Sequence, residues 1–328
     1  MQKPELDVVG IGNAIVDVLS HTEEAELIRL GLTKGSMRLI DAHEARDLYQ
    51  RIGPAVECSG GSAANTIAGI ASLGGTAAYI GKVQTDQLGD VFRHDLRSLG
   101  VEFDTPPATH GPSTARCFVL VTPDGQRTMQ TFLGVSVELG ADDIAAEQIA
   151  RAQVTYLEGY LFDPPAAQRA FIKAARIAHD AKRRVALTLS DSFCVERHRA
   201  AFLDLVHGHV DILFANEHEI CSLYQVADFD QALQQVRGHC EVAVLTRSEK
   251  GSVVLRGDEL HVVDAVPGVK VVDTTGAGDL YAAGFLYGFT HGRDLAASGR
   301  IGAIAAAEVI AHFGARPETS LRSLIERV

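Results

Sequence analysis

Short apolar runs alternate with longer segments of helical periodicity along most of the chain. Runs of this kind, separated by helical patterns such as residues 165–181 and 231–239, are typical of buried parallel strands in a doubly wound α/β sheet. The predicted strands are DVVGIG (7–12), AAYIGKV (77–83), VTYLEGYL (154–161), RVALTLS (184–190), VDILFAN (210–216) and VAVLTRS (242–248).

Two regions do not follow this alternation of apolar runs and helical segments. Residues from about 15 to 40 and from about 101 to 133 carry short alternating stretches, among them ARCFVLVTPDGQRTMQTF at 115–132. The Pro-Asp-Gly sequence between two β-rich arms predicts a hairpin. We therefore expect these two segments to form a small β-sheet lid on a single domain spanning residues 1–328. Because such a lid has open edges, either a monomer or a homodimer is compatible with it.

Composition excludes several classes of protein. The net charge of −12 lacks the basic excess that a nucleic-acid surface needs, so no nucleic-acid partner is expected. The five cysteines are scattered without a CxxC pair, which indicates neither a disulfide framework nor a zinc site. We find no signal peptide and no long apolar span, and therefore expect a cytoplasmic protein that has no membrane partner.

The stretch VVDTTGAGDLYAAGFLYGF (271–289) places two glycines and an acid at the start of an apolar run. Free N–H groups around Gly276, Ala277 and Gly278 would converge at the positive end of a helix, where phosphate is favoured. Asp279 is open to two interpretations. It is either a cap of the helix or, because an acid repels phosphate, a base opposite a hydroxyl group in phosphoryl transfer.

A second helix start of this kind occurs in CSGGSAANTIAGIASLGG (58–75). Gly60, Gly61 and Ser62 open it, and Asn65 lies on the first turn, where its amide can both donate and accept hydrogen bonds. Small residues at this point serve either close packing of the helix on the sheet or the approach of a ligand.

The first predicted strand leads into VVGIGNAIVD (8–17), which contains Gly-x-Gly. Ile15 stands where a dinucleotide fingerprint requires its third glycine, so the pattern argues against a Rossmann dehydrogenase. Asp17 follows the strand and is either an exposed turn acid or a ligand contact at the carboxyl edge of the sheet.

Two later strands end in polar residues. Asn216 and Glu219 lie three residues apart in FANEHEI. They either cap a helix or hold the waters of a magnesium ion. Thr246 and Arg247 in LTRSEKG are candidates for phosphate contact, although an arginine beside Glu249 and Lys250 is also compatible with a solvated surface.

Together these motifs resemble the two signatures of the PfkB, or ribokinase-like, carbohydrate and nucleoside kinases. GGSAANT and DTTGAGD carry the resemblance, NEHE and TRSEKG occur between them in the expected order, and the similarity covers nearly the whole chain. GIGNAIVDV, YLEGYLF, LTLSDSF and VDILFANEHE are most similar to the adenosine kinases of this family. The resemblance implies a Rossmann-like α/β/α domain with a small β-sheet lid. It also implies ATP- and Mg²⁺-dependent phosphorylation of a hydroxymethyl group on a small-molecule nucleoside or sugar.

The resemblance also implies roles for individual residues. Asp279 would be the catalytic base, kept ionised by the helix dipole, and the amides of Gly276, Ala277 and Gly278 would form the anion hole. The residues implied at the acceptor are Asn13, Asp17, Gly61, Ser62 and Asn65. Those implied for ATP and magnesium are Asn216, Glu219, Thr246, Arg247, Gly251 and Gly278.

In adenosine kinases the lid gives apolar contacts to the purine. The matching region here reads MQTFLGVSVEL, so Phe132 and Leu133 are the candidates, with Leu161 or Phe162 opposite them. Some members of the family bind a monovalent cation such as K⁺ near the acid that corresponds to Asp273. The leading hypothesis is therefore a nucleoside 5′-kinase acting on adenosine. A kinase of a free sugar such as ribose or fructose is the alternative, and a catalytically silent small-molecule sensor is the candidate from another class.

Overall fold

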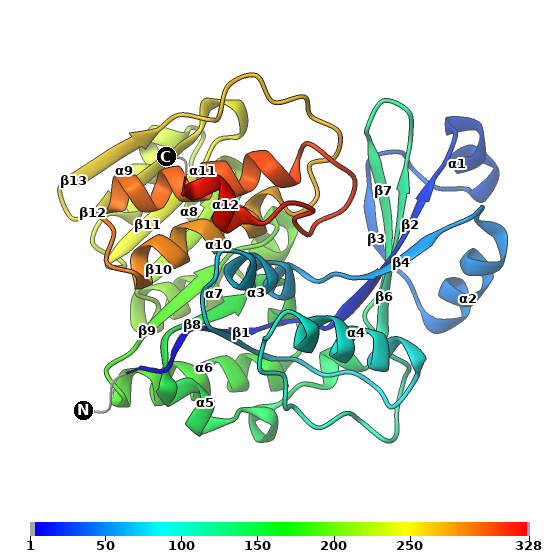
Figure 1. Cartoon of the computed structure of the whole chain (residues 1–328), viewed down its shortest axis with the longest axis horizontal. Coiled ribbons are helices and arrows are strands. Elements are labelled where there is room, and N and C mark those ends of the chain that lie inside the picture. The colour runs from blue at the N-terminus through cyan, green and yellow to red at the C-terminus, as the bar shows by residue number, and fades with distance from the viewer. Residues whose placement is uncertain (1–3, 327–328) are drawn as a thin grey trace.

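The computed structural model describes residues 4–326, and its largest element is an eight-stranded sheet (Figure 1). The strand order is β13-β12-β11-β10-β9-β8-β1-β5, parallel from β5 to β11 and antiparallel at β12 and β13. The strands are β1 (Leu6–Ile11), β5 (Ala77–Ile80), β8 (Ala152–Glu158), β9 (Arg184–Thr188), β10 (Ile212–Asn216), β11 (Val242–Thr246), β12 (Ser252–Arg256) and β13 (Glu259–Val263). All six runs predicted from the sequence form the parallel part of this sheet.

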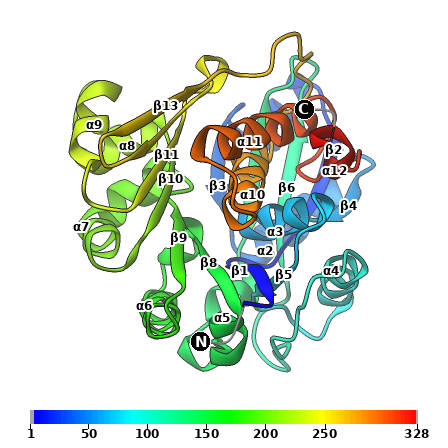
Figure 2. The ribbon, with the colours of Figure 1, turned by 60° about the vertical axis from the view of Figure 1, so that its left-hand side comes forward.

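Helices cover both faces of the sheet (Figure 2). Alternate side chains of one strand serve different faces, so Val9 packs in one apolar cluster and Val8 in the other. One cluster contains residues of α5 (Ala146–Arg151), α6 (Pro165–Asp180), α7 (Ser192–His209), α8 (Glu217–Tyr224) and α9 (Phe229–Val236). The other contains residues of α3 (Ser62–Ser72), α4 (Gln87–Ser98), α10 (Ala277–Thr290), α11 (Leu295–Val309) and α12 (Leu321–Ile325). The predicted three-layer α/β/α class is confirmed.

A second, five-stranded sheet stands to one side of the first (Figure 1) and has the order β3-β7-β6-β2-β4. Its strands are β2 (Ile15–His21), β3 (Met37–Leu39), β4 (Val56–Ser59), β6 (Ala115–Val121) and β7 (Arg127–Phe132). Helices α1 (Glu24–Leu30) and α2 (Ala42–Arg51) accompany it. The predicted hairpin is confirmed: β6 and β7 pair antiparallel around the turn in which Thr122 N–H donates to the Gln126 carbonyl over 3.0 Å.

The small sheet does not coincide with the two segments expected from the sequence. Strand β4 lies outside them, and it is only four residues long with its first two residues exposed. Residues 101–108 run instead beside the large sheet, where Glu102 N–H donates to the Ala77 carbonyl over 3.0 Å and Ala108 N–H to the Val83 carbonyl over 2.8 Å. No helix among residues 4–326 is long and apolar enough to cross a membrane.

Candidate active site

A cavity of about 430 Å³ lies where the carboxyl ends of the parallel strands meet the small sheet and the N-terminus of α10. This is the edge at which open α/β sheets bind ligands. Most residues predicted from the sequence line it: Asn13, Asp17, Gly61, Ser62, Asn65, Leu133, Asn216, Glu219, Thr246, Gly276, Ala277, Gly278 and Asp279. The chain therefore brings both glycine-led helix starts to one chamber.

The N-terminus of α10 leaves room for an anion. Gly276 caps the helix at φ 77°, and a Cβ there would lie 2.7 Å from the Ala315 carbonyl oxygen, so only glycine fits without strain. A Cβ at Gly278 would instead point into open space, with no neighbouring atom outside its own helix turn within 4 Å. Since the first amides of a helix have no partner one turn earlier, this space can hold a phosphate group.

Asp279, on the first turn of α10, is held by the other glycine-led helix. Ser62 Oγ donates to its Oδ1 over 2.6 Å, and Asn65 Nδ2 donates to its Oδ2 over 3.0 Å. The sequence predicted a pKa kept low by the helix dipole, but burial raises the pKa of Asp279, against these two hydrogen bonds and the charge of Arg127. The oriented carboxylate is thus a better proton acceptor than the sequence indicated.

The acceptor end of the cavity contains a second unusual acid. Asp17 is 9% exposed, and burial raises its pKa to about 7, partly offset by the charge of Arg316. No hydrogen bond to its carboxylate is recorded among residues 4–326, which leaves its oxygens available for hydroxyl groups. Arg316, which the sequence analysis did not identify, also donates from Nε to Asn65 Oδ1 over 3.5 Å.

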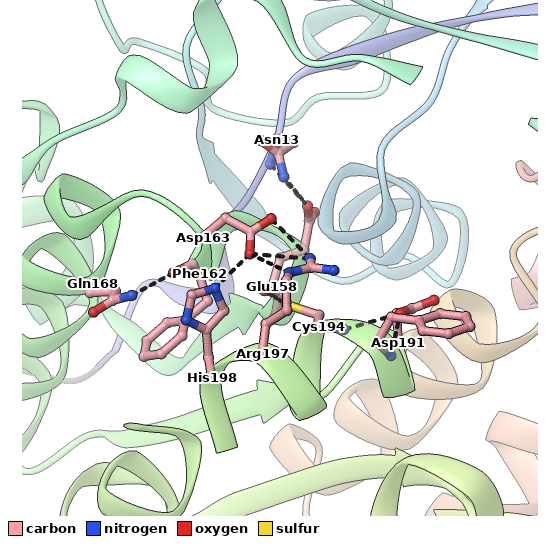
Figure 3. A network of polar contacts seen from close by, with 11 residues as sticks. Asn13, Glu158, Phe162, Asp163, Gln168, Asp191, Cys194, Arg197 and His198 are labelled. Atoms are coloured by element: carbon pink, nitrogen blue, oxygen red, sulfur yellow. Dashed lines mark hydrogen bonds and ion pairs between the residues drawn. The ribbon is translucent and has the colours of Figure 1, made fainter. Parts of the chain in front are cut away.

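Glu158 is a site residue that the sequence analysis missed, although the run containing it was recognised. It lies at the end of β8, is 1% exposed and lines the cavity. Asn13 donates from Nδ2 to Oε1 over 2.8 Å (Figure 3). Ala63 N–H donates to Oε2 over 2.8 Å. Burial raises its pKa to about 7. The sequence signal for Glu158 was an acid at the carboxyl end of a buried strand. By accepting these two hydrogen bonds, Glu158 joins the end of β1 to the start of α3.

The small sheet contributes alternate residues of β7 to the cavity. Arg127, Met129 and Thr131 line it, because successive strand residues face opposite sides. The prediction for Phe132 is therefore wrong. Its ring belongs to the apolar cluster with Val18 and Phe118 within the small sheet. Leu133, beyond the strand, does line the cavity.

Leu161 is also misplaced by the sequence prediction. It is fully buried in the core of the large domain, and its neighbour Tyr160, in the 3-10 turn Gly159–Phe162, lines the cavity instead. The remaining apolar lining contributed by the small sheet comes from Ile15, Met37, Leu39 and Cys117.

Arg127 links the small sheet to the anion site. It donates from Nη1 to Thr275 Oγ1 over 2.7 Å and from Nη2 to Thr274 Oγ1 over 3.1 Å. These threonines directly precede Gly276, so the arginine brings a positive charge to the side of the helix start where phosphate would lie. The alternation along β7 could have identified it.

At the other end of the cavity, Asn216 and Glu219 form a complete capping box at the start of α8. Asn216 Nδ2 donates to Glu219 Oε1 over 2.6 Å, and burial raises the pKa of Glu219 to about 7. Both residues line the cavity, so the cap and a ligand contact are compatible. A 6% exposed carboxylate whose charged form is disfavoured is a suitable neighbour for a cation.

Two residues predicted at the ATP side face elsewhere. The guanidinium of Arg247 lies 4.2 Å from the centre of the Phe229 ring and pairs with Glu217 over 3.4 Å, outside the cavity. Gly251 does not line the cavity either. Its φ of 77° and the Val263 carbonyl oxygen, 2.0 Å from a Cβ built there, explain the glycine as a turn requirement.

Asp273 is 1% exposed and its carboxylate is already used within the protein. Oδ1 accepts from Thr275 N–H over 2.9 Å and lies 3.5 Å from Arg127 Nε, while Oδ2 accepts from Gly314 N–H over 3.1 Å. The carboxylate is therefore engaged by the protein itself, and a monovalent cation beside it stays a prediction.

Known proteins are similar to this chain over most of its length. The model of the pfkB family of carbohydrate kinases matches residues 33–321. A solved structure of an adenosine kinase from Sinorhizobium meliloti is 53% identical, covers 98% of this chain and 99% of its own, and superposes with a TM-score of 0.94. A probable sugar kinase from Rhizobium etli is 52% identical over 99% of this chain and 98% of its own, with a TM-score of 0.95. An ATP-dependent ribose-1-phosphate kinase from Halopiger xanaduensis is 32% identical over 70% of this chain and 73% of its own.

Proposed function

Because this chain belongs to the pfkB family of carbohydrate kinases, and is thus an ATP-dependent kinase of a hydroxyl group, we propose that it phosphorylates the 5′-hydroxymethyl group of a nucleoside. The preferred reaction is adenosine + ATP → AMP + ADP. The observation that carries the proposal is the Asp279 carboxylate, fixed by Ser62 and Asn65 beside a helix start with open space at Gly278.

In the proposed mechanism Asp279 accepts the proton of the 5′-hydroxyl group. The 5′-oxygen forms a bond to the γ-phosphorus, while the bond between the γ-phosphorus and the oxygen that bridges it to the β-phosphate breaks. The amides at Gly276, Ala277 and Gly278 stabilise the negative charge on the phosphoryl oxygens. Little basicity is needed, since catalysis of this reaction depends mostly on positioning and charge stabilisation.

Magnesium fits the chemistry of the residues present. Glu219 and Asn216 offer oxygen atoms at the nucleotide end, and residues 4–326 contain no group of three or more His, Cys, Asp or Glu residues that could hold a metal. The ion would therefore be bound through water and phosphate, as Mg²⁺ commonly is. When bound it would supply positive charge to the phosphates.

The small sheet acts in this proposal as a lid over the acceptor. Its residue Arg127 already contacts Thr274 and Thr275, so the guanidinium lies beside the helix start where the phosphoryl group would transfer. Closure of the lid over the acceptor would exclude water. Substrate-independent ATP hydrolysis as fast as transfer would contradict this role.

The choice of adenosine rests on the apolar lining contributed by the small sheet and on the similarity to the Sinorhizobium meliloti protein. Aliphatic and thioether side chains such as Leu39 and Met129 can pack against a heterocyclic base, whereas a free sugar offers little surface to them. The similarity to a ribose-1-phosphate kinase keeps a sugar acceptor as the second candidate.

The experiment is ADP release by the purified protein with ATP and Mg²⁺, comparing adenosine, inosine, guanosine, cytidine, ribose and fructose at equal concentrations. Preference for adenosine supports the proposal. Preference for a free sugar would retain the role of Asp279 and remove the nucleoside assignment, and inactivity on every acceptor would favour the small-molecule sensor.

A further inference from the structure

One carboxylate at the edge of the cavity is shared by two consecutive residues of α7. Asp163 Oδ2 lies 3.1 Å from Arg197 Nη2, and Asp163 Oδ1 lies 2.6 Å from His198 Nε2 (Figure 3). Consecutive side chains of a regular helix diverge by about 100° and do not reach one partner. The helix is broken at His198, which has φ −123° and ψ 23°, and this break allows both side chains to face Asp163.

The ion pair between Asp163 and Arg197 is part of the cavity wall. Both residues line the cavity next to Tyr160, and Asp163 directly follows the 3-10 turn Gly159–Phe162. The Arg197 side chain is 51% exposed. Its recorded hydrogen bonds within residues 4–326 use Nε and Nη2, which leaves Nη1 as a donor without a protein partner there.

The stereochemistry of a furanoside indicates what lies against this wall. The proposed function puts the 5′-hydroxyl group at Asp279, which leaves the free carboxylate of Asp17 in the same cavity for the 2′- and 3′-hydroxyl groups. In a β-nucleoside the base on C1′ lies on the same face of the ring as C5′, opposite the 2′- and 3′-hydroxyl groups, and so extends toward the remaining walls. These are the apolar lining contributed by the small sheet and the segment with Tyr160, Asp163 and Arg197.

The two walls differ in what they can recognise. Leu39 and Leu133 offer only apolar contact, which does not distinguish bases by their polar edges. The guanidinium of Arg197 is a charged donor in a fixed orientation, and once a bound ligand covers it, such a donor discriminates between ligands with and without an acceptor atom.

We propose that Arg197, held in place by Asp163 and His198, hydrogen-bonds an acceptor atom on the edge of the heterocyclic base and so makes the site select nucleosides over free sugars. This inference rests on the proposed function and assigns the specificity of the same site. Arg197 is the contacting residue, and Asp163 and His198 are positioning residues.

The test is steady-state kinetics of the wild type and Arg197→Gln with adenosine, 3-deazaadenosine, 7-deazaadenosine and ribose. The matched control is Arg169→Gln, which removes an exposed arginine of α6 outside this cavity. We expect Arg197→Gln to raise KM for adenosine at least about tenfold with kcat changed less than twofold, as for loss of one hydrogen bond to a charged group. The deaza analogue that lacks the contacted nitrogen should bind equally to both proteins, and kinetics with ribose should not change.

An adenosine KM for Arg197→Gln within twofold of that for Arg169→Gln would overturn the inference while leaving the nucleoside kinase intact. A wild type that does not phosphorylate adenosine would refute the proposed function, and this inference with it. Asp163→Asn retains the guanidinium but loosens it, so a smaller rise in KM is expected. If Arg197→Gln unfolds at a lower temperature than the control, the same analogues are compared with Arg197→Lys, because lysine keeps a charged donor but with a different geometry.

Discussion

Ser62 donates its hydroxyl hydrogen to Asp279 Oδ1 over 2.6 Å and so joins the starts of two helices that are 217 residues apart in the sequence. The same hydrogen bond stabilises the charged form of a buried carboxylate whose pKa is raised. Replacing Ser62 by alanine should therefore raise the pKa of Asp279 further and move the acidic limb of the kcat/KM profile to higher pH. The control is Ser98→Ala, which removes a hydroxyl group that donates to the Asp95 carbonyl on α4. A profile unchanged from the control would show that this hydrogen bond does not tune the base.

Asp279→Asn tests the base itself. The amide retains nearly the same shape and can still meet Ser62 and Asn65, so the fold and the binding of both substrates should persist. We expect kcat to fall by about 10²- to 10⁴-fold, the usual contribution of general base catalysis. Turnover and isothermal titration with adenosine are the measurements, and a near-normal kcat would remove Asp279 from its role.

Substitutions at Gly278 and Gly276 distinguish a glycine that leaves space for the phosphoryl group from a glycine that the backbone conformation requires. A methyl group at Gly278 would enter open space at the helix start, so Gly278→Ala should unfold like the wild type and lose most of kcat. Gly276→Ala, with φ 77° and the Ala315 carbonyl in contact, should be destabilised by at least about 1 kcal/mol. Thermal unfolding and turnover distinguish the two, and equal stability losses would contradict the assignment of open space to Gly278.

The Asp17 carboxylate should lower the free energy of unfolding of the protein at neutral pH. Burial raises its folded pKa to about 7 from 3.8, so the folded state binds a proton more tightly than the unfolded state. Its favourable contribution is present below about pH 4 and is lost as pH rises to about 7. Asp17→Asn should consequently gain up to about 4 kcal/mol over the wild type at pH 8 and show little gain at pH 4, while losing affinity for the acceptor. Urea unfolding at both pH values tests this, with the exposed Asp142→Asn as control. Equal gains at both pH values would be inconsistent with a raised pKa.

The parallel sheet and both glycine-led helix starts were predictable because buried strands and phosphate-binding turns have local signatures. DTTGAGD, for example, needs only its own residues to suggest the anion site. Which residues of the small sheet face the cavity was harder to predict from the sequence. The alternation that places Arg127, Met129 and Thr131 in the cavity turns Phe132 away from it.

Long-range partnerships could not be inferred in the same way. Glu158 receives hydrogen bonds from Asn13 and Ala63, which are 145 and 95 residues away, and no local pattern encodes that convergence. Arg247 was plausible beside Thr246 on sequence grounds, yet its ring contact with Phe229 on α9 depends on tertiary packing. Gly251 is explained by a close approach of Val263 that only the folded chain reveals.

The most direct test of the central claim is the identity of the phosphorylated product, followed by ³¹P NMR with ATP, Mg²⁺ and adenosine, and with 5′-deoxyadenosine as the acceptor that lacks the hydroxyl group. The account predicts adenosine 5′-phosphate and ADP in equal amounts from adenosine, and no transfer to 5′-deoxyadenosine. ADP and inorganic phosphate without a nucleoside phosphate, or phosphate on any other oxygen, would contradict it.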